Sequence, residues 1–484
     1  MRVLLPAAAV SIVSVLVAGC AQVFGIANTT AAQGSASLTI ERVSIGASVV
    51  LSAQDLSAQT ATFYLPDASD PTVLTAVPGT QADTDVWTAR LGGDPLVQFT
   101  LPDLPMPIQH LWELPASQLS GPFLAHEHPS PQPPADTSML DVEVNLPSAY
   151  QTTEALQVLA VGAWTTHVLS GTEVPAAGMP AIAATIPYNT FTPATESPVA
   201  AIDNDDVVLV LRSVNGQLTG VFQTSFDQTA GIDMVAGSMV AVAADQTFAG
   251  PVDPTSVSTR LSAARPSVTT PAVAWNVVAA PGAAVLDAAG PLLNAGTVPD
   301  GTTAISAMYG NPFGSLGWDA IATVSLTETR PYTFMGVALT LGATLTMVGE
   351  ASTLAFDFAA PVPEQVNLDD NQLAIDGATV AIDTSAAHQV TLLSENRAAI
   401  LYELTLYDLS VNGTTATVQP VLDAISTDTT FTIPPDLFQS GHTYIPAVRS
   451  IASGFPNAAA GDLQTRSLPF ETAVFEGGVF TVNP

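Results

Sequence analysis

The sequence LDVEVNL at residues 140–146 alternates apolar and polar residues without a break. Because side chains along a strand point alternately to opposite faces, this alternation predicts a strand with one buried face and one solvated face. The run VVLVL at residues 207–211 is apolar throughout and is bounded by acids and Arg212, which is typical of an interior strand. Val-Asn-Gly at 214–216 and 411–413 predicts two tight hairpin turns, since Asn and Gly tolerate the positive φ that such turns require.

The same signals continue along the rest of the chain. Pro, Gly, Asp and Asn recur between short segments rich in Val, Thr, Leu and Phe, and no segment shows a sustained helical period with caps. A composition rich in Ala, Thr and Val favours sandwiches over helices, with short helices in the Ala-rich stretches as the alternative. The sequence therefore predicts an all-β fold of several serial β-sandwich domains.

The charge of the chain excludes several functions. The 484 residues include 43 Asp and Glu but only 10 basic residues, all of them arginine, for a formal net charge of −33. Binding to nucleic acid needs a basic surface that neutralises phosphates, so we expect no nucleic-acid partner. Because the sequence contains no lysine, it cannot form a Walker A phosphate loop, a pyridoxal Schiff base or a Ser-x-x-Lys acyl-transfer site.

The amino terminus reads as a targeting signal. The apolar run at residues 3–17 follows a basic residue, is too short to span a membrane as a helix, and ends in small residues before Cys20. The sequence LVAGC at 16–20 resembles the lipobox of bacterial lipoproteins. That resemblance implies that a signal peptide, residues 1–19, is removed and that Cys20, the only cysteine in the sequence, is acylated. An ordinary secretory signal with a chance cysteine is the alternative.

The lipobox resemblance also implies a location. Ala21 stands where an Asp would resemble an inner-membrane retention signal, so we expect a protein of the cell envelope that is anchored by lipid in the outer membrane. The acidic surface would repel anionic lipid, so the acyl chains must supply the attachment. With Cys20 acylated, no thiol remains for a disulfide, a metal site or a nucleophile. Residues 27–37 are small and polar, which predicts a flexible tether over the lipidated segment 20–37.

A second resemblance lies near the carboxyl terminus. In FQSGHTY, residues 438–444, an apolar residue stands six positions before a tyrosine and a glycine stands three before it. This spacing resembles the turn before strand F of fibronectin type III domains, where it builds a tyrosine corner. The resemblance implies that residues 430–433 form strand E and that Tyr444 leads strand F. Pro446 departs from the pattern, as does the lack of any tryptophan after Trp318, so the resemblance favours an immunoglobulin-like sandwich over that exact family.

Changes in composition predict the domain boundaries. Nine prolines lie between residues 101 and 134, and proline cannot donate to a central ladder, so we interpret this part as a connector. Residues 361–363, Pro-Val-Pro, look like an interdomain joint. Behind the tether we expect a small β-sandwich (38–103), a Pro-rich connector (104–138), a large β domain that is single or split in two near 251–271 (139–358), and an immunoglobulin-like sandwich (360–484).

Histidines give one candidate metal site. His126 and His128 lie two residues apart, so on an extended segment both imidazoles point the same way and could bind one Zn²⁺, with His110 as a third ligand. The spacing does not match His-Glu-x-x-His, and the segment lies within the proposed connector, where nothing obvious holds the ligands rigid. We therefore favour the interpretation that this segment is a solvated polar loop.

Acidic clusters give a candidate for Ca²⁺, which binds carboxylate and carbonyl oxygens on loops. One cluster contains Asp203, Asp205 and Asp206 before the predicted interior strand, and a second spans residues 369–377. Neither cluster matches the Asp-x-Asp-x-Asp-Gly loop, and clusters arise by composition alone in so acidic a chain. The alternative is turn formation, which Asp and Asn favour.

The sequence motifs for catalysis give weaker signals than those for metal binding. The sequence contains no Gly-x-Ser-x-Gly elbow, and 43 acids give no means of choosing a carboxylate pair for glycoside hydrolysis. The loop at 309–313 carries Tyr309 and is followed by Trp318, and these two aromatic residues are candidates to stack on a sugar ring. The alternative, and the weightier one, is that the aromatic side chains pack the turn into the core.

Taken as a whole, the sequence favours a lipid-anchored envelope protein with a structural, adhesion or scaffolding role and no identifiable catalytic site. Its expected partners are the membrane, through the lipid, and an envelope protein or a polysaccharide. A carbohydrate-binding or glycan-processing surface lipoprotein is the first alternative, and an interaction module braced by Ca²⁺ is the second. A sandwich fold does not decide among these, because it serves many unrelated functions.

Overall fold

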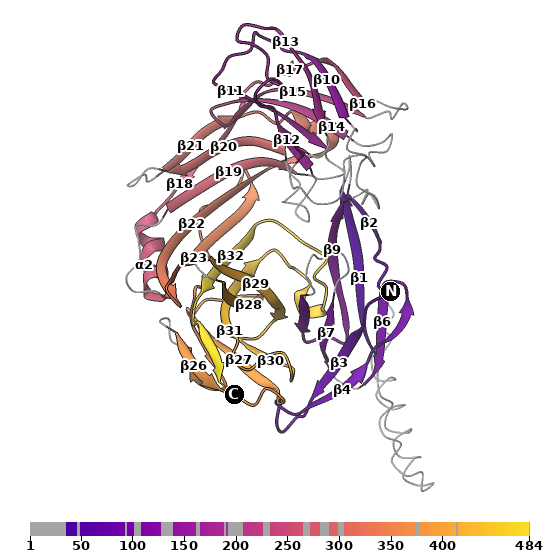
Figure 1. Cartoon of the computed structure of the whole chain (residues 1–484), viewed down its shortest axis with the longest axis vertical. Helices are drawn as coiled ribbons and strands as arrows, with labels where there is room; N and C mark the ends of the chain where they lie inside the picture. Colours follow the sequence, from indigo (N-terminus) through magenta and orange to yellow (C-terminus); the bar gives the residue numbers. More distant parts are fainter. Residues whose placement is uncertain are drawn as a thin grey trace, which may run out of the picture.

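The computed structural model confirms the all-β architecture. Strands arranged in several sheets dominate the described residues, which contain one short α-helix (Figure 1). No helix in this part of the chain is long and apolar enough to cross a membrane. The structure describes residues 35–45, 49–91, 94–100, 108–126, 139–160, 165–187, 190–191, 207–225, 233–264, 272–280, 290–298, 304–373, 377–412 and 415–483.

Two sheets build the N-terminal region. In the first sheet β1 pairs antiparallel with β2 and β6 and parallel with β9. In the second sheet β3 pairs with both β4 and β7, and β7 also pairs with β8. Side chains from both sheets, including Leu38 and Phe63, share one buried core. The strands are β1 (Ser35–Ile45), β2 (Val49–Ala53), β3 (Ala61–Pro66), β4 (Leu74–Pro78), β5 (Thr80–Asp83), β6 (Val86–Arg90), β7 (Leu96–Thr100), β8 (Gln109–Glu113) and β9 (Gln118–His126).

The interpretation of residues 104–138 as a connector is wrong for part of its length, because β8 and β9 lie within it. Seven of the nine prolines fall in 101–107 and 127–134, outside both strands. Pro122 does lie within β9, which pairs with β1 and otherwise has only an isolated bridge from Ser120 to Asp462 among the described residues. A proline is tolerated in a strand where one edge lacks continuous ladder bonds.

The next unit, which we call the middle sandwich, spans residues 139–241 and lies at the top of Figure 1. The sheet β13–β10–β16 packs against a sheet that contains β11, β12, β14 and β15 around a core drawn from residues 140–239. The strands are β10 (Met139–Asn145), β11 (Glu154–Ala160), β12 (Thr165–Val168), β13 (Ala181–Pro187), β14 (Val207–Val214), β15 (Gln217–Ser225), β16 (Asp233–Ser238) and β17 (Val240–Ala241).

Three predictions about the middle sandwich are confirmed. Exposure alternates along β10, with Leu140, Val142 and Val144 buried. The apolar run that begins β14 is buried throughout, because its alternate side chains face two different cores. The β14–β15 hairpin turns at Asn215 and Gly216, whose φ angles of 50° and 80° are both positive, as the Asn-Gly pair predicts.

The part of the chain that follows adds long strands to a second and larger core. The single α-helix of the described residues, α2 (Pro254–Ala264), lies inside the interval 251–271 where a split was considered. Asp253 caps it by accepting a hydrogen bond of 3.0 Å from the Ser256 backbone N–H. The other elements are β18 (Gln246–Pro251), β19 (Ala272–Ala280), β20 (Gly290–Val298), β21 (Ala304–Tyr309), the short helix η3 (Pro312–Leu316), β22 (Asp319–Phe334) and β23 (Val337–Glu350).

The C-terminal region contains the predicted tyrosine geometry. β30 covers residues 430–433, Tyr444 lies at the start of β31, and its hydroxyl accepts a 3.0 Å hydrogen bond from the Gln439 N–H. Gly441 has a φ of 82° in the turn between them, and the Phe438 ring lies edge-on to Tyr444 at 5.5 Å. The elements are β24 (Pro363–Leu368), β25 (Asn371–Gln372), β26 (Ala378–Ala381), β27 (His388–Ser394), β28 (Leu401–Asn412), β29 (Thr415–Ser426), β30 (Thr430–Ile433), β31 (Thr443–Ser453), η4 (Ala458–Ala460), β32 (Phe470–Glu476) and β33 (Phe480–Asn483).

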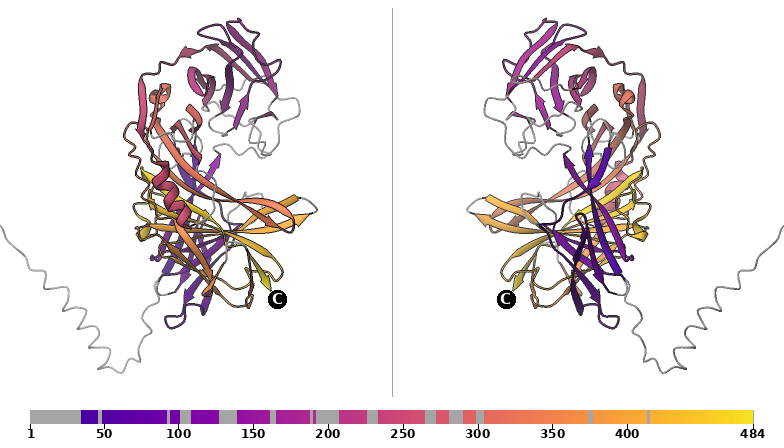
Figure 2. Two further views of the ribbon diagram at one scale, coloured as in Figure 1. Left: turned by 90° about the vertical axis from the view of Figure 1, so that its left-hand side faces the viewer. Right: turned by 90° about the vertical axis from the view of Figure 1, so that its right-hand side faces the viewer.

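Strand pairing runs across the expected domain boundaries near residues 103, 138 and 359. One hydrogen-bonded path, which we call the long ladder, connects the strands in the order β4–β3–β7–β8–β29–β28–β31–β32–β23–β22–β19–β20–β15–β14–β11–β12. The N-terminal region joins it through the parallel pair β8–β29, and the middle sandwich through the single register pair Gln217 and Leu293. Figure 2 shows the resulting arrangement, with the N-terminal and C-terminal strands interleaved below the middle sandwich.

Candidate functional site

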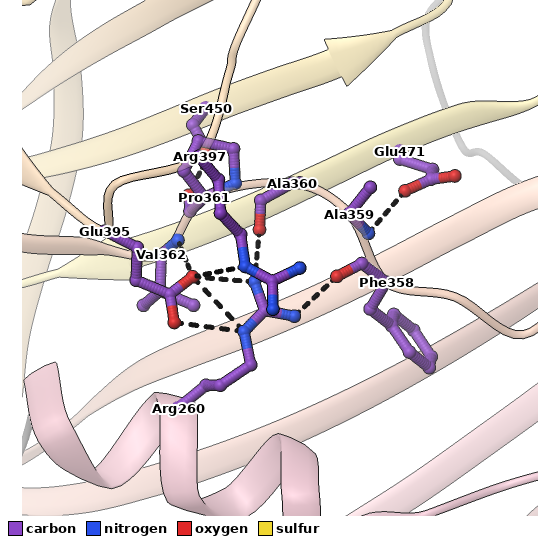
Figure 3. A network of polar contacts seen from close by, with 10 residues as sticks. All are labelled: Arg260, Phe358, Ala359, Ala360, Pro361, Val362, Glu395, Arg397, Ser450 and Glu471. Carbon is purple, nitrogen blue, oxygen red and sulfur yellow. Dashed lines mark hydrogen bonds and ion pairs between the residues drawn. The ribbon is translucent and has the colours of Figure 1, made fainter.

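An arginine from α2 holds the joint between the central and C-terminal parts of the chain (Figure 3). The Arg260 guanidinium donates to both carboxylate oxygens of Glu395, with Nη2 to Oε2 at 2.7 Å and Nε to Oε1 at 3.0 Å. It also donates through Nη2 to the Ala360 carbonyl at 2.6 Å, and through Nη1 to the Phe358 carbonyl. Its planar fork therefore binds a carboxylate and two backbone carbonyls at once, which a lysine could not reproduce.

Glu395 completes this joint from the other side. Its Oε2 accepts a 3.0 Å hydrogen bond from the Val362 N–H, and the exposed Arg397 approaches the same oxygen at 3.7 Å. Burial opposes ionisation of Glu395, but the hydrogen bonds from Arg260 and Val362 and the charge of Arg260 outweigh it, so the pKa lies below the usual range. The ion pair is therefore charged at neutral pH and fixes the segment 358–362 in place.

A pocket of about 390 Å³ lies beside the joint. Its walls include Glu350, Asp357 and Glu471, together with the apolar side chains of Leu354 and Leu468. Burial and repulsion from Asp357 raise the pKa of Glu471, although its Oε2 accepts a 2.7 Å hydrogen bond from the Ala359 N–H. The described residues contain no group of three side chains suited to hold a metal ion, so these acids carry no metal assignment.

A second group of titratable side chains lies on one face of β8, β28, β29 and β31. Glu403 pairs with Arg449 at 2.8 Å, and Asp423 lies 3.3 Å from Nδ1 of His110. Burial raises the pKa of Glu403, and repulsion from Asp423 adds to this, while the charge of Arg449 opposes it. A carboxyl group with a raised pKa near a second carboxylate is the pattern of an acid–base pair. Neither carboxylate lines the pocket beside the joint, so we assign this pair no catalytic role.

The structure places the predicted Zn²⁺ ligands on different sheets. His110 lies on β8 in the long ladder, where its ring stacks on Phe99 at 5.3 Å. His126 ends β9, which belongs to the sheet of β1, and His128 lies outside the described residues. The acidic cluster of Asp203, Asp205 and Asp206 also lies outside the described residues.

The second acidic cluster is engaged in local structure. Asp369 and Asp370 have φ angles of 47° and 62° in the turn between β24 and β25. The Asp369 carboxylate accepts a 2.6 Å hydrogen bond from Nδ1 of His388 and a 2.9 Å bond from the Gln389 N–H. These bonds fit the alternative that Asp forms turns here. Asp376, the remaining acid of this cluster, lies outside the described residues.

The aromatic residues proposed to stack on a sugar are buried. Tyr309 and Trp318 are each 1 % exposed and belong to the large core, where the Trp318 ring packs against Phe313 at 5.7 Å. Burial also raises the pKa of Tyr309. Asn311 caps the short helix η3 by accepting from the Phe313 N–H at 3.0 Å, which turns these rings inward. The sugar-stacking interpretation is therefore wrong for these rings, and the packed-turn alternative describes them.

Sequence reasoning missed the ion pairs of two arginines, the buried Arg212 and the partly buried Arg260. Arg260 and Arg212 each bind a carboxylate and backbone carbonyls far along the chain. Arg212 is 4 % exposed and its partner Glu154 lies on the neighbouring strand β11. The one available signal was that Arg212 directly follows the apolar run at 207–211, which predicts an interior strand where an unpaired charge would be costly.

Comparisons with known proteins show only remote similarity. No protein-family profile matches the sequence, and no curated protein sequence matches it. A streptococcal ancillary pilin has 8 % identity and a TM-score of 0.13 over 63 % of this chain and 95 % of its own. Tandem repeats from the extending region of a large adhesion protein have 11 % identity and a TM-score of 0.11 over 91 % of this chain and 99 % of theirs. A Salmonella alpha-2-macroglobulin mutant has 9 % identity and a TM-score of 0.11 over 92 % of this chain and 29 % of its own. TM-scores this low carry no argument about fold or function.

Proposed function

We propose that this chain is a lipid-anchored envelope protein with a structural role, holding binding surfaces at a fixed geometry as an adhesin or scaffold does. The observation that supports this most is the long ladder, because backbone hydrogen bonds join the N-terminal, central and C-terminal parts. Flexibly linked modules would instead reorient independently, since domains joined only by linkers move relative to one another by default.

The junction of the N-terminal and C-terminal regions supports the same proposal. Beside the β8–β29 pairing, the Thr432 N–H donates to Glu113 at 2.9 Å and the Gln464 side chain donates to Glu41 at 2.6 Å. Leu401 and Phe455 of the C-terminal region belong to the same buried core as the N-terminal strands. Polar and apolar contacts therefore act together to keep these two regions in one orientation.

The Arg260 joint offers a direct test of this rigidity. Arg260→Gln removes the guanidinium that Glu395 and two carbonyls share and leaves Glu395 with the Val362 N–H as its nearest donor. Breaking a fully buried pair costs about 3–5 kcal/mol, which is the upper bound for this partly buried one. We expect faster hydrogen exchange across residues 358–362 and a lower melting temperature. Arg397→Gln is the matched control, because Arg397 is 44 % exposed and meets Glu395 only at 3.7 Å. Equal rates of hydrogen exchange across residues 358–362 in the two variants would contradict the proposed role of the Arg260 joint in rigidity.

The lipid anchor has its own test. Cys20→Ser should release the protein from the membrane fraction or block its processing, because the acyl chains would have no attachment point. Membrane fractionation of cells that express the wild type or the variant measures this. A Cys20→Ser protein that is fully processed and still membrane-bound through the same extraction steps would contradict the anchor.

The role itself is tested by capturing the partner from intact cells. The sequence has no lysine, and an acylated Cys20 has no free amine, so the cross-linker must be photoactivated or directed at carboxylates. A specific protein recovered at near-stoichiometric yield would support an adhesin or scaffold. A purified protein that hydrolyses members of a glycan or ester panel would overturn the proposal, and bound polysaccharide would favour the carbohydrate-binding alternative.

A further inference from the structure

The first strand of the fold is where the segment that follows Cys20 enters the folded body. β1 begins at Ser35, so residues 21–34 connect it to Cys20. In a protein held by lipid at Cys20, a pull from the membrane reaches the folded part through the start of β1. How β1 is held therefore decides how the fold responds to that pull.

Both edges of β1 are hydrogen-bonded to other strands. Nine register pairs join β1 in parallel to β9, beginning with Ser37 and Gln118. On the opposite edge, residues 35–39 pair with β6 and residues 41–45 pair with β2. Parallel pairing has evenly spaced bonds, so the nine pairs with β9 form one continuous ladder.

The buried face of β1 adds side-chain packing to this pairing. Ala36, Leu38 and Ile40 are each at most 1 % exposed and belong to the core of the N-terminal region. Because side chains alternate between faces, a slip of β1 by one residue would turn these apolar side chains to the solvent face. Such a slip is unfavourable, so β1 cannot yield to a pull by sliding along β9 in single steps.

Contacts with the C-terminal region hold β1 and β9 to the rest of the body. The Gln464 side chain donates to Glu41 of β1 at 2.6 Å. The Ser120 N–H of β9 donates to the Gly461 carbonyl at 2.9 Å, and the Ser120 carbonyl accepts from the Leu463 N–H at 2.9 Å. β9 is therefore bonded to the C-terminal region as well as to β1, so a pull on β1 does not simply carry β9 away with it.

The direction of the strands determines how a pull acts on this ladder. β9 runs parallel to β1, and β10 of the middle sandwich is the next described strand in the sequence. β1 and β9 run side by side toward the middle sandwich, which lies at the far end from the start of β1 (Figures 1 and 2). A pull between the start of β1 and the middle sandwich therefore acts along the strands, with the two forces at opposite ends of the pair.

A pull along the strands loads the register pairs together. When two paired strands are pulled apart at one end, the ladder opens one pair after another, and each step breaks little. When they are pulled from opposite ends along their length, most of the ladder and the core packing of β1 must break in a single step. A single backbone hydrogen bond adds little net stability, so the resistance comes from sharing the load among many bonds.

We propose that β1 and β9 form a mechanical clamp, which transmits force between the lipid tether and the middle sandwich without unfolding. The proposal rests on the lipid-anchored role proposed above, because that role places the pulling point before β1. An adhesin or scaffold is pulled in this way when a partner bound at its far end moves relative to the membrane. The clamp would then keep the N-terminal strands folded while the protein is under load.

Single-molecule force spectroscopy on the purified protein tests the clamp. The chain from residue 20 with Cys20→Ser keeps every described residue, carries no lipid and has no remaining cysteine. One handle is fixed at its N-terminus, and the second is attached to a single introduced cysteine. Glu143→Cys, on the exposed face of β10, gives a pull along the strands. Gln118→Cys, which is also exposed and lies opposite Ser37 at the start of β9, gives a pull across the same pair.

We expect the pull along the strands to need about twice the force of the pull across them at the same loading rate, because forced unfolding is governed by the unfolding barrier. Leu38→Ala should lower the force in the Glu143 geometry, because it removes packing from β1. Leu140→Ala is the matched control, since it makes the same change in the core of the middle sandwich, and it should leave that force unchanged.

Two results would overturn the proposal. The first is an equal rupture force in the two pulling directions, and this comparison decides the question even if Leu38→Ala does not fold. The second is a force in the Glu143 geometry that falls with Leu140→Ala but not with Leu38→Ala, which would place the point of failure in the middle sandwich. No lipid is present in these measurements, so they leave the anchor to the Cys20→Ser fractionation test, and a failed anchor would leave the rupture forces as they are.

Discussion

Strands β10 and β14 lie on opposite sides of one core and differ in how many of their faces are buried. Val142 of β10 and Val210 of β14 belong to the core of the middle sandwich. The other face of β10 carries the exposed Glu143, whereas the other face of β14 carries Leu209 and packs into the large central core. β10 therefore forms an outer layer, and β14 forms a wall shared by two cores.

This difference shows why the middle sandwich is not an independently folded domain. The sheet of β11, β14 and β15 has apolar side chains on both faces, so removing the neighbouring core would expose a hydrophobic surface. The outer sheet β13–β10–β16 has no such second core among the described residues. Stability on the two sides of β14 should therefore be coupled, while changes on β10 should remain local.

The largest expected effect comes from the polar end of β14. Arg212 is 4 % exposed and bonds Glu154, and its Nη1 donates to the Ser148 carbonyl at 2.9 Å. Arg212→Met would leave a buried carboxylate unpaired, so we expect a loss of about 3–5 kcal/mol in the free energy of unfolding, measured by denaturant titration. The control is Glu143→Gln on the exposed face of β10, which should change it by less than about 0.5 kcal/mol. Similar losses in both variants would remove the distinction between the two strands.

The same ion pair predicts a pH dependence. Burial opposes ionisation of Glu154, but the hydrogen bond and charge of Arg212 outweigh it and hold the pKa of Glu154 below the usual range. The stabilisation is therefore complete above the ordinary pKa of a glutamate and is lost as the pH falls through the lower pKa of the folded state. Melting temperatures measured from neutral to acidic pH should converge for the wild type and Arg212→Met. A constant difference down to pH 2 would contradict this linkage.

Core substitutions test whether β14 couples the two cores. Leu209→Ala removes side-chain volume from the large core and should cost about 2–5 kcal/mol. Leu140→Ala makes the same change on β10, where only the core of the middle sandwich is affected. We expect hydrogen exchange to rise on both sides of β14 in the first variant, but only within residues 139–241 in the second. Exchange confined to one core in both variants would show that the shared wall does not transmit the change.

The smallest effect concerns the turn that closes β14. Asn215 has a φ of 50°, in the left-handed region that costs a residue with a Cβ about 1–2 kcal/mol. Asparagine tolerates this region because its short polar side chain can hydrogen-bond locally, so Asn215→Ala should lower the free energy of unfolding by up to about that amount. Asn215→Gly is the matched control and should change the free energy of unfolding by a few tenths of a kcal/mol. Thermal denaturation of both variants measures the difference. A stable Asn215→Ala protein would mean that the hairpin tolerates another turn type.

Local features of the fold were predictable from the sequence. The alternation at 140–146, the buried run at 207–211 and the Asn-Gly hairpin at 214–216 depend on neighbouring residues, and each is found as predicted. The tyrosine corner that the resemblance at residues 438–444 implies is also local, since the Tyr444 hydroxyl bonds a backbone N–H five residues away. The loop with Tyr309 is different, because spacing alone could not decide between a surface and a buried turn.

Which strands pair with one another across long distances in the sequence was determined only by the tertiary structure. The hydrogen bond between Glu113 and Thr432 joins residues 319 positions apart, and Arg260 reaches Glu395 across 135 positions. Every strand offers the same backbone donors and acceptors, so local sequence determines that a segment is a strand and which of its faces is apolar, but not which edge it joins. The packing of whole sheets around shared cores selected the β8–β29 pairing, and that selection made the chain one connected structure.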